Sequence, residues 1–483
     1  MKTEPMAHQI TGGNLLAANP GFYGLGAEQG TGKTWMLLAD AEAQWKSGKA
    51  TAVLVVAPKG VHTNWIRREI PLHMGIPLRA DYYASGAGKR RTKAWEALLE
   101  RDDRWLTIFA INIDALNTPN GYKFAARFLK AHKAIMITDE SSRIKNPGAA
   151  RTKKAIKLGT LAISRRIASG TMMTQGPQDV FSQFEFLLES GGLLGTTSYR
   201  AFVAEYCQTL PPDNPIVIEA ARKSGFAPQI IARDPTGRPI FRNLERLREL
   251  MSPYIYRVLK KDCLDLPPKV YSNHYFELPP SQRKVYEAAL HELRYERDNG
   301  AIDKFSALTK LNKLRQITSG FIMLDGVATA LPEDSARLSA FKDLVEDVDG
   351  QFIVWAVYRE EIRQIAEALR AAGISTVEYH GGVKEKAREE AVDDFQGGSA
   401  RAFVGNAQAG GIGLTLTAAE TSIYYSNDFS LELRLQSEDR NHRKGTKGTV
   451  RYIDLVAVDS IDEKVASVLQ SKSEVADFVM NNL

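Results

Sequence analysis

A glycine-rich turn near the amino terminus carries the residue types that bind phosphate. Residues 27–34 read Ala-Glu-Gln-Gly-Thr-Gly-Lys-Thr. Gly30 and Gly32 let the backbone turn its amides toward an anion, Lys33 supplies a charge to the outer phosphates, and Thr34 offers a hydroxyl to Mg²⁺. The helical spacing that follows would add a helix N-terminus to the same anion. We predict a phosphate loop, although Ala27 stands where the strict pattern has glycine; a surface turn is the alternative.

Two adjacent carboxylates follow an apolar run in Ile135-Met-Ile-Thr-Asp139-Glu140. Neighbouring side chains at the end of a strand point to opposite sides, so Asp139 can hold the magnesium shell while Glu140 reaches toward an attacking water. Alone, such a pair is more often a solvated turn. Because it follows a phosphate loop, and open parallel sheets bind ligands at their carboxyl edge, we interpret it as a Walker B arrangement.

A third group of polar residues, Gln436 to Gly445, contains Arg440 and Arg443. Their spacing is that of one helical turn, so both guanidinium groups can face the same way and meet a polyphosphate charge. Weak surface ion pairs with neighbouring acids are the alternative. Since these residues lie far from the phosphate loop in sequence, they belong to another lobe, and we predict an arginine finger that reaches across a cleft.

The composition is that of an ordinary soluble protein, with 44% hydrophobic and 25% charged residues among 483. No apolar run is long enough to span a membrane, and the amino terminus lacks the apolar core of a signal peptide. We therefore expect a cytoplasmic protein, of a bacterium or of the host cell if viral, with no membrane contact. Cys207 and Cys263 show no ligand spacing, which argues against a zinc site.

The net charge of +6 permits a polyanionic partner without requiring one. The basic residues are unevenly placed, because residues 141–178 contain no acidic side chain. A solvated helix face and a surface that contacts nucleic acid or another lobe explain this run equally well. Its basic residues are Arg143, Lys145, Arg151, Lys153, Lys154, Lys157, Arg165 and Arg166.

Short β-branched runs alternate with helical stretches, which predicts an α/β fold with parallel sheets covered by helices. The strands expected in the first half are 51–57, 106–111, 134–138 and 166–169, and those in the second half are 351–356, 376–379, 401–404, 422–425 and 450–457. The pattern is helical and interrupted by proline-rich loops over about 181–312. We predict one lobe over 1–267 with a helical insertion at about 181–260, and a second over 268–483 with an insertion at about 281–325, joined near Leu266-Pro-Pro268.

The order of these motifs resembles the superfamily-two helicase-like ATPases. The segments that carry this resemblance are 27–34, 55–59, 139–146, 169–171, 409–417 and 436–443. More narrowly, the chain looks like a SWI/SNF-type DNA translocase of the small bacterial or viral type. The narrower match rests on 254–262 followed by 266–269, on 276–286 and on 439–445.

This resemblance implies two RecA-like parallel-sheet lobes in tandem, with ATP and Mg²⁺ as cofactors. It implies that Gln9 reads the adenine edge, that Gln436 orients the water, and that the arginines neutralise the transferring phosphoryl group. The ATP-binding residues would be Gln9, Gly30, Thr31, Gly32, Lys33, Thr34 and Gly413, the metal-binding residues Thr34 and Asp139, and the catalytic residues Glu140, Gln436, Arg440 and Arg443. The residues that contact nucleic acid or couple it to hydrolysis would be Pro58, Lys59, Ser169, Thr171, Tyr358, Arg359, Gly381 and Gly382.

The chain departs from the family pattern at two places beside these motifs. Ser141-Ser142 replaces the Ala-His that commonly follows the acidic pair, and Met172-Met173 stands where proline usually follows Gly-Thr. The first departure puts the usual relay from hydrolysis to the DNA path in doubt. Neither touches the predicted metal and water positions.

Three functions are consistent with these residues. The first is a monomeric, nucleic-acid-stimulated ATPase that translocates on double-stranded DNA without separating the strands, holding the backbone largely without regard to sequence. The second is a strand-separating helicase on DNA or RNA, although no wedge element is evident. The third, an interaction protein switched by ATP, is disfavoured because both carboxylates and both arginines are present.

Overall fold

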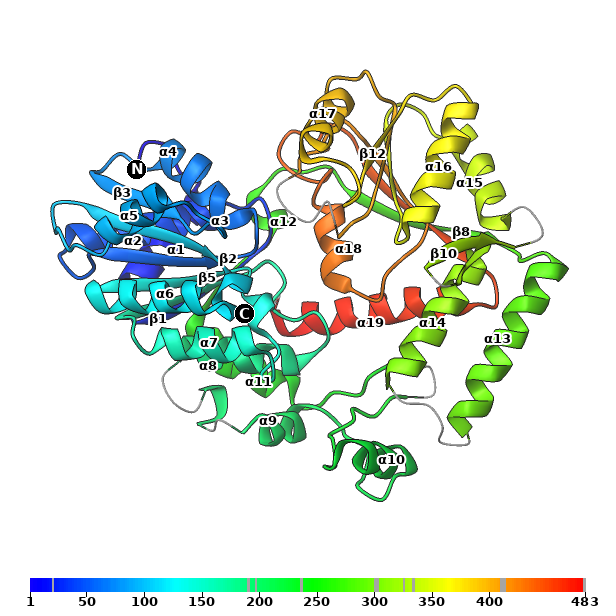
Figure 1. Ribbon diagram of the computed structural model, residues 1–483, viewed down its shortest axis with the longest axis horizontal. Coiled ribbons are helices and arrows are strands. Elements are labelled where there is room, and N and C mark those ends of the chain that lie inside the picture. Colours follow the sequence, from blue (N-terminus) through cyan, green and yellow to red (C-terminus); the bar gives the residue numbers. More distant parts are fainter. Residues whose placement is uncertain are drawn as a thin grey trace. The chain divides into compact units, whose positions relative to one another are not determined.

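The computed structural model describes residues 1–19, 21–188, 192–195, 198–234, 238–298, 304–324, 326–331, 335–408 and 414–480. The chain divides into two compact units, which are described separately (Figure 1). The first unit contains Met1–Gln208, Phe241–Leu264 and the residues from Glu474 onward. The second contains Thr209–Ile240 and Asp265–Ser473.

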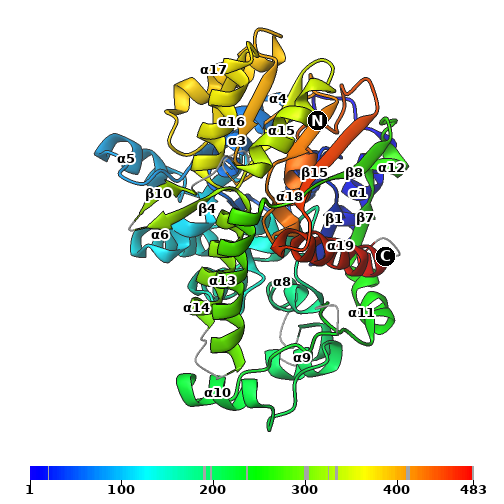
Figure 2. The ribbon, with the colours of Figure 1, turned by 90° about the vertical axis from the view of Figure 1, so that its right-hand side faces the viewer.

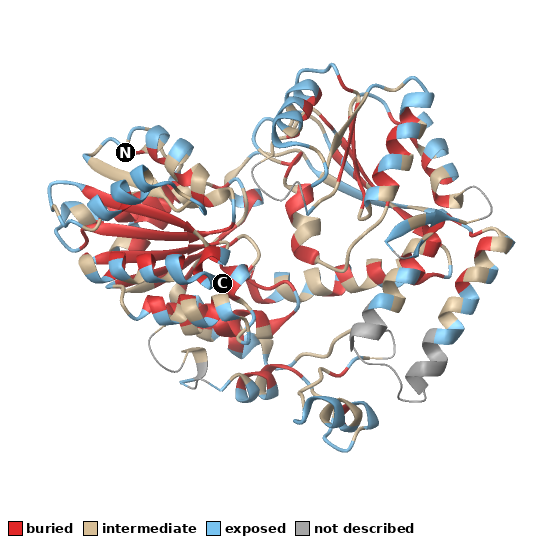
Figure 3. Cartoon of the chain, viewed as in Figure 1, coloured by how far each residue is buried: buried red, intermediate tan, exposed pale blue. Residues whose placement is uncertain are grey.

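A seven-stranded parallel sheet forms the centre of the first unit, in the order β3-β4-β2-β5-β6-β1-β7. All residues of β2 and β5 are buried, because helices cover both faces of a parallel sheet (Figure 3). The strands are β1 (Phe22–Ala27), β2 (Ala52–Ala57), β3 (Leu78–Tyr82), β4 (Leu106–Asn112), β5 (Ala134–Asp139), β6 (Ser164–Ala168) and β7 (Ile255–Val258).

The helices of the first unit connect these strands and cover the sheet (Figure 1). The α-helices are α1 (Ala7–Ala18), α2 (Lys33–Lys46), α3 (Val61–Asn64), α4 (Ile70–His73), α5 (Lys89–Ala97), α6 (Pro119–Ala131), α7 (Ala150–Gly159), α8 (Phe181–Leu187), α9 (Tyr199–Tyr206), α11 (Leu244–Met251) and α12 (Lys260–Cys263). A π-helical segment, η1 (Trp65–Glu69), joins α3 to α4. The 3₁₀ segments are η2 (Ile113–Asn117), η3 (Ser141–Ile144), η4 (Pro177–Val180), η5 (Gly192–Leu194) and η6 (Ser252–Tyr254).

The second unit contains a six-stranded parallel sheet in the order β12-β13-β11-β14-β15-β8. Its strands are β8 (Lys269–Phe276), β11 (Phe352–Trp355), β12 (Thr376–Tyr379), β13 (Ala402–Gly405), β14 (Thr421–Tyr424) and β15 (Val450–Ala457), and β9 (Phe321–Leu324) and β10 (Val327–Ala330) form a separate antiparallel pair. The helices are α10 (Pro215–Ser224), α13 (Pro280–Asp298), α14 (Lys304–Thr318), α15 (Ala336–Glu346), α16 (Arg359–Ala371), α17 (Glu385–Gln396), α18 (Leu431–Glu438) and α19 (Ile461–Met480). Helices α13 and α14 lie side by side (Figure 2).

The two compact units differ from the predicted lobe ranges in two longer stretches, and the boundary near residue 267 shifts to Leu264. Residues 209–240 group with the second unit, and the last turns of α19 group with the first. The second difference has a clear physical cause, because Val479 and Met480 are buried in the hydrophobic core of the first unit.

The predicted α/β class is confirmed, and each predicted strand is present within two residues of its expected start. The helical pattern assigned to about 181–260 is wrong at its end, where Ile255–Val258 forms β7 beside β1. Strands β3, β9 and β10 were also missed, as were β1 and β8. Glycines interrupt the pattern of β1, and most residues of β8 are exposed, so neither strand shows a continuous apolar run. None of the described helices has both the length and the apolar character needed to cross a bilayer.

Candidate functional site

The predicted phosphate loop connects β1 to α2 and has the backbone that anion binding requires. Gly30 and Gly32 adopt φ values of 84° and 86°, in the left-handed region that favours glycine. Thr31 closes the turn by donating its hydroxyl to the carbonyl of Glu28 at 2.7 Å. Helix α2 then begins without a side-chain cap and without an acidic residue in its first turn. Its N-terminal amides and dipole are therefore available to an anion.

Lys33 lies at the start of α2, and its Nζ donates to the carbonyl of Ala27 at 2.9 Å. Ala27 ends β1 and is not among the described residues with positive φ. Its replacement of the usual glycine therefore causes no backbone strain. The departure in sequence leaves the geometry of the loop intact.

Gln9 lies against the phosphate loop although it belongs to α1. Its Oε1 accepts from the amide of Met6 at 2.9 Å, and its Nε2 donates to the carbonyl of Thr31 at 3.4 Å. A Cβ placed on Gly32 would lie 1.8 Å from Gln9 Nε2, so a side chain there would displace the Gln9 amide as well as strain a backbone with φ 86°. The structure brings Gln9 and the loop together, and the reading of adenine by Gln9 stays a prediction.

Asp139 is buried at the end of β5, with both carboxylate oxygens engaged. Oδ2 accepts from the indole Nε1 of Trp65 at 2.8 Å, and Oδ1 accepts from the amide of Glu140 at 3.1 Å. Burial raises the pKa of Asp139, while the Trp65 hydrogen bond and the charge of Lys33 act in the opposite direction. The positive charge of Lys33 thus favours the ionised form of the Asp139 carboxyl.

The donor set fits a magnesium ion shared with phosphate. The described residues contain no group of three or more His, Cys, Asp or Glu that could form a complete metal cage. Mg²⁺ instead uses one or two carboxylates together with substrate phosphates and water. Asp139 supplies such a carboxylate, and Thr34 offers a hydroxyl oxygen as a further ligand.

Glu140 follows Asp139 with a left-handed backbone, φ 54° and ψ 59°. Such a conformation is uncommon for a residue other than glycine, and strained residues of this kind cluster at functional sites. Its Oε2 accepts from the hydroxyl of Ser169 at 3.4 Å, and Ser169 Oγ in turn accepts from the amide of Thr171 at 3.1 Å. The end of β6 also lies near the phosphate loop, since a Cβ at Gly170 would lie 3.3 Å from the amide of Gln29. Three predicted residues thus meet at this point.

The residues that depart from the family pattern form a buried network of their own. Ser141 donates to Oε1 of Gln183 at 2.6 Å, and Gln183 Nε2 donates to the carbonyls of Met172 at 2.8 Å and Asp179 at 2.7 Å. Ser141, Ser142 and Gln183 are all buried. The sequence offered no sign of the contact between Gln183 and Ser141, because the two residues lie 42 positions apart.

Lys260 lies beside the phosphate loop, and the sequence analysis gave this residue no role. Its amide donates to Oε2 of Glu28 at 2.7 Å, and its buried side chain reaches within 3.9 Å of a Cβ placed on Gly30. The amide of Glu28 in turn donates to the carbonyl of Val258 at 3.0 Å. Strand β7 and the residues after it therefore support the phosphate loop. The sequence analysis noted the segment 254–262, which contains β7, only as a family motif.

In the second unit, the predicted catalytic residues surround the end of α18. Gln436 is buried on α18, and its Nε2 donates to Glu432 Oε1 at 3.4 Å. The expectation that Arg440 and Arg443 share a helical turn is wrong, because α18 ends at Glu438. They are held instead by the segment that precedes β14. The carbonyl of Arg440 accepts from the amide of Leu416 at 2.9 Å, and Arg443 Nη1 donates to Thr415 Oγ1 at 3.0 Å. Gly413 lies outside the described residues.

Two segments predicted to follow a nucleic-acid backbone come together in the second unit. Arg359 begins α16, and its guanidinium nitrogens lie 3.5 Å and 3.8 Å from Cβ atoms placed on Gly381 and Gly382. All three residues are exposed. An exposed guanidinium beside two residues without side chains leaves room for a phosphate group. Tyr358, the residue before Arg359, is turned toward the protein instead. Its hydroxyl donates to the carbonyl of Asn312 at 3.4 Å, and burial raises its pKa to about 12.

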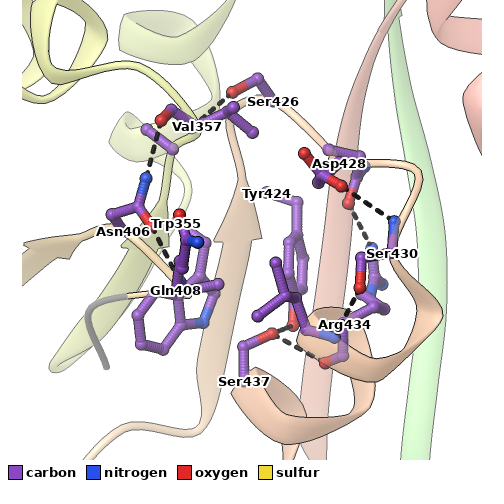
Figure 4. A pocket seen from close by; sticks show the side chains of 14 residues that line it. Trp355, Val357, Asn406, Gln408, Tyr424, Ser426, Asp428, Ser430, Arg434 and Ser437 are labelled. Carbon is purple, nitrogen blue, oxygen red and sulfur yellow. Dashed lines mark hydrogen bonds between the residues drawn. The ribbon is translucent and has the colours of Figure 1, made fainter. Parts of the chain in front are cut away.

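A pocket opens beside this segment at the carboxyl ends of β11, β13 and β14 (Figure 4). Polar side chains that line the pocket form hydrogen bonds with other lining residues. Asn406 donates to the carbonyl of Val357 at 2.7 Å, and the hydroxyls of Tyr424 and Ser437 share a hydrogen bond at 2.7 Å. The guanidinium of Arg434 lies 3.5 Å from the centre of the Tyr424 ring and pairs with Asp454. These contacts hold α18 against the sheet.

The basic run at 141–178 separates into two groups. Arg165 and Arg166 are buried on β6, where Arg166 pairs with Asp40 at 2.9 Å and Arg165 donates to the carbonyl of Gly159 at 2.9 Å. These two arginines support the fold and form no surface, contrary to both explanations of the run. Lys153 and Lys157 are exposed on α7, and their role stays a prediction.

In the first unit, Pro58 is buried at the end of β2 while Lys59 is exposed.

Comparison with known proteins identifies the family. The family model described as the SNF2-related domain matches residues 24–320, and the helicase conserved C-terminal domain matches residues 336–445. The chain belongs to the SNF2-related family. The resemblance drawn from the motifs is confirmed.

Several curated relatives align along nearly the whole chain. An ATP-dependent helicase of Mycoplasma pneumoniae is 25% identical over 93% of this chain and 39% of the relative. The helicase/translocase YwqA of Bacillus subtilis is 24% identical over 95% of this chain and 46% of the relative. The DNA annealing helicase and endonuclease ZRANB3 of mouse is 26% identical over 94% of this chain and 38% of the relative. The chain thus spans less than half the length of these relatives.

A solved structure also aligns with the whole chain. It is the SWI2/SNF2 ATPase core of Sulfolobus solfataricus in complex with double-stranded DNA, 22% identical, with a TM-score of 0.40 and coverage of 100% of this chain and 94% of that one.

Proposed function

We propose that this SNF2-related chain hydrolyses ATP with Mg²⁺ and uses the free energy to translocate on double-stranded DNA without separating its strands. The observation that carries the proposal is the meeting of three groups in the first unit. These groups are the uncapped N-terminus of α2 behind Gly30 and Gly32, the buried carboxylate of Asp139, and the carboxylate of Glu140 beside Ser169.

Each group has a chemical role in this proposal. The loop amides and Lys33 bind the phosphates, while Thr34 and Asp139 hold the metal. A bound magnesium ion would neutralise charge on the phosphate oxygens. Glu140 orients the attacking water and accepts its proton. Arg440 and Arg443, which the second unit carries, stabilise the charge that develops on the transferring group.

Duplex DNA is proposed as the track on chemical grounds. Lys59 and Arg359 are exposed at segments that the family resemblance assigns to the backbone path, and Arg359 lies beside two glycines. Contacts of this kind reach phosphates and carry no sequence information. The names of the relatives, which include DNA annealing helicase and helicase/translocase, support an ATP-driven activity on DNA.

The test is steady-state ATP hydrolysis by the purified chain with duplex DNA, single-stranded DNA, RNA or no nucleic acid. We expect the largest stimulation with duplex DNA, equal for unrelated sequences. Stimulation should fall as salt rises, because bound lysines and arginines release counterions from the DNA backbone. Stimulation by RNA alone, or by single strands more than by duplex, would favour the strand-separating helicase instead. A monomeric state and a cytoplasmic location stay predictions.

A further inference from the structure

Trp65 links the predicted DNA-binding turn of the first unit to the predicted metal carboxylate. The turn begins at Pro58, directly after β2, and Gly60 adopts φ 90° before the helical run 61–73 starts. Lys59 is exposed at this turn, while Trp65 is 1% exposed in the core behind it. The same short segment thus presents one side chain to solvent and another to the nucleotide site.

The contact of Trp65 with Asp139 is direct. The indole Nε1 donates to Oδ2 at 2.8 Å, and this is a contact between side chains 74 residues apart. The other oxygen, Oδ1, accepts only a backbone amide from Glu140 among the hydrogen bonds described. Donors that hold a metal-binding carboxylate orient it, and such partners affect metal affinity and activity strongly.

The backbone at Trp65 is also unusual. Residues 65–69 form a π-helical segment, η1, inside an otherwise α-helical run. Single π-helical turns inside α-helices occur frequently at functional sites. Here the π-helical turn starts at the residue whose indole reaches Asp139.

The residues after the acidic pair also depart from the family pattern at this place. Ser141 and Ser142 follow the acidic pair in place of Ala-His, and both are buried. Ser141 binds Gln183 and so faces the interior of the first unit. The indole of Trp65, by contrast, contacts the acidic pair directly from the segment that follows the turn.

We propose that Trp65 is a positioning residue that couples DNA contact at the Pro58–Asn64 turn to the orientation of Asp139. This inference rests on the proposed function. Movement of the turn when Lys59 meets a DNA phosphate shifts the helical run and, through the indole N–H, the plane of the Asp139 carboxylate. Trp65 itself touches neither ATP nor DNA in this account.

The test compares Trp65→Phe with Trp95→Phe. Trp95 is a matched control, because it is also buried and its indole donates to a carboxylate, Asp81 Oδ2, at 2.9 Å. The first measurement is binding of a fluorescent ATP analogue at increasing Mg²⁺ without DNA, and the second is hydrolysis with and without duplex DNA. For Trp65→Phe we expect the half-saturating Mg²⁺ concentration to rise, and the DNA stimulation to fall, each by about 10-fold. Trp95→Phe should match the wild type in both.

The outcomes separate this inference from the proposed function. A wild-type enzyme without any DNA stimulation overturns the proposed function and the coupling with it. A stimulated wild type together with undiminished stimulation in Trp65→Phe overturns the coupling alone. If Trp65→Phe does not fold, incorporation of β-(3-benzothienyl)alanine at position 65 keeps the ring shape and removes only the N–H donor. Normal Mg²⁺ dependence and normal DNA stimulation in that variant would overturn the proposal.

Discussion

The two units use the same local architecture, a parallel strand that runs into a helix, for opposite purposes. In the first unit β1 leads through Gly30 and Gly32 into α2, which begins without a side-chain cap or an acidic residue in its first turn. In the second unit β11 leads into α16, which begins with Glu360 and Glu361 in its first turn. Glu361 is fully buried, and its Oε2 accepts from the amides of Val357 at 3.0 Å and Tyr358 at 2.9 Å.

The difference teaches where an anion can bind. The N-terminal amides of a helix attract negative charge, and in α16 an internal carboxylate already occupies that position. Glu361 is held further by the hydroxyls of Ser426 and Ser319, each at 2.6 Å. Among the described residues, no side chain caps α2, and its first turn contains no acidic residue. The comparison therefore favours the first unit as the place where an anion binds at a helix N-terminus.

The largest expected effect comes from removing the ammonium group of Lys33 at the N-terminus of α2. Lys33→Ala should abolish ATP hydrolysis and weaken nucleotide binding, because the outer phosphates lose their point charge. Steady-state hydrolysis and titration with a fluorescent ATP analogue measure the two effects. Lys46→Ala, at the other end of α2, is the control and should behave as wild type. Substantial turnover by Lys33→Ala would break the assignment of the site to α2.

Arg443→Ala should lower the catalytic constant by about a thousand-fold, as for other arginines that act on a transferring phosphoryl group. ATP binding should change little, since the first unit keeps its loop. Single-turnover hydrolysis with saturating ATP is the measurement. Arg451→Ala removes an exposed arginine of β15 and serves as the control. Equal catalytic constants for the two variants would show that the second unit supplies no catalytic arginine at position 443.

Glu140→Gln should lower hydrolysis by about 100-fold or more while ATP binding is retained, because the amide keeps the shape but cannot accept the proton. The hydrogen bond from Ser169 can persist, so the fold around residue 140 should be unchanged. Hydrolysis and binding of the ATP analogue again separate the two effects. Turnover near the wild-type rate would exclude Glu140 as the base.

The smallest expected effect is on the free energy of unfolding and tests the N-terminus of α16. Glu361→Gln should lower the stability of the second unit by about 1–3 kcal/mol, because a buried charged acceptor of several hydrogen bonds is lost. Glu360→Gln is the control. It removes a partner of the exposed Arg363, and such surface pairs contribute about 0–1 kcal/mol. Urea unfolding monitored by circular dichroism compares the two variants. Equal stability would show that Glu361 is not essential to the cap of α16.

The sequence predicted the elements whose local pattern is complete. β2 and β5 are apolar throughout because both faces of their sheet are covered, and the loop and acidic pair were found by residue type and spacing alone. β8 was missed because it is largely exposed at the edge of its sheet. The helical spacing of Arg440 and Arg443 was misleading because α18 ends before them.

Other site residues could not have been found from local pattern. Trp65 meets Asp139 across 74 residues, and Gln183 meets Ser141 across 42. Glu361 looks like an ordinary acidic residue in the first turn of a helix until its burial and its four donors are known. These contacts depend on which strands become neighbours in the sheet, and local spacing does not encode that order.

The most direct test of the account is displacement of the third strand from a DNA triplex by the wild-type protein. A motor that moves along duplex DNA should release the third strand in the presence of ATP, and neither a non-hydrolysable ATP analogue nor the Glu140→Gln variant should support release. In the same conditions a forked duplex should stay paired, since opening it costs about 1.4 kcal/mol of stacking per base-pair step. Absence of ATP-dependent triplex displacement together with efficient unwinding of the fork would contradict the account and identify a strand-separating helicase.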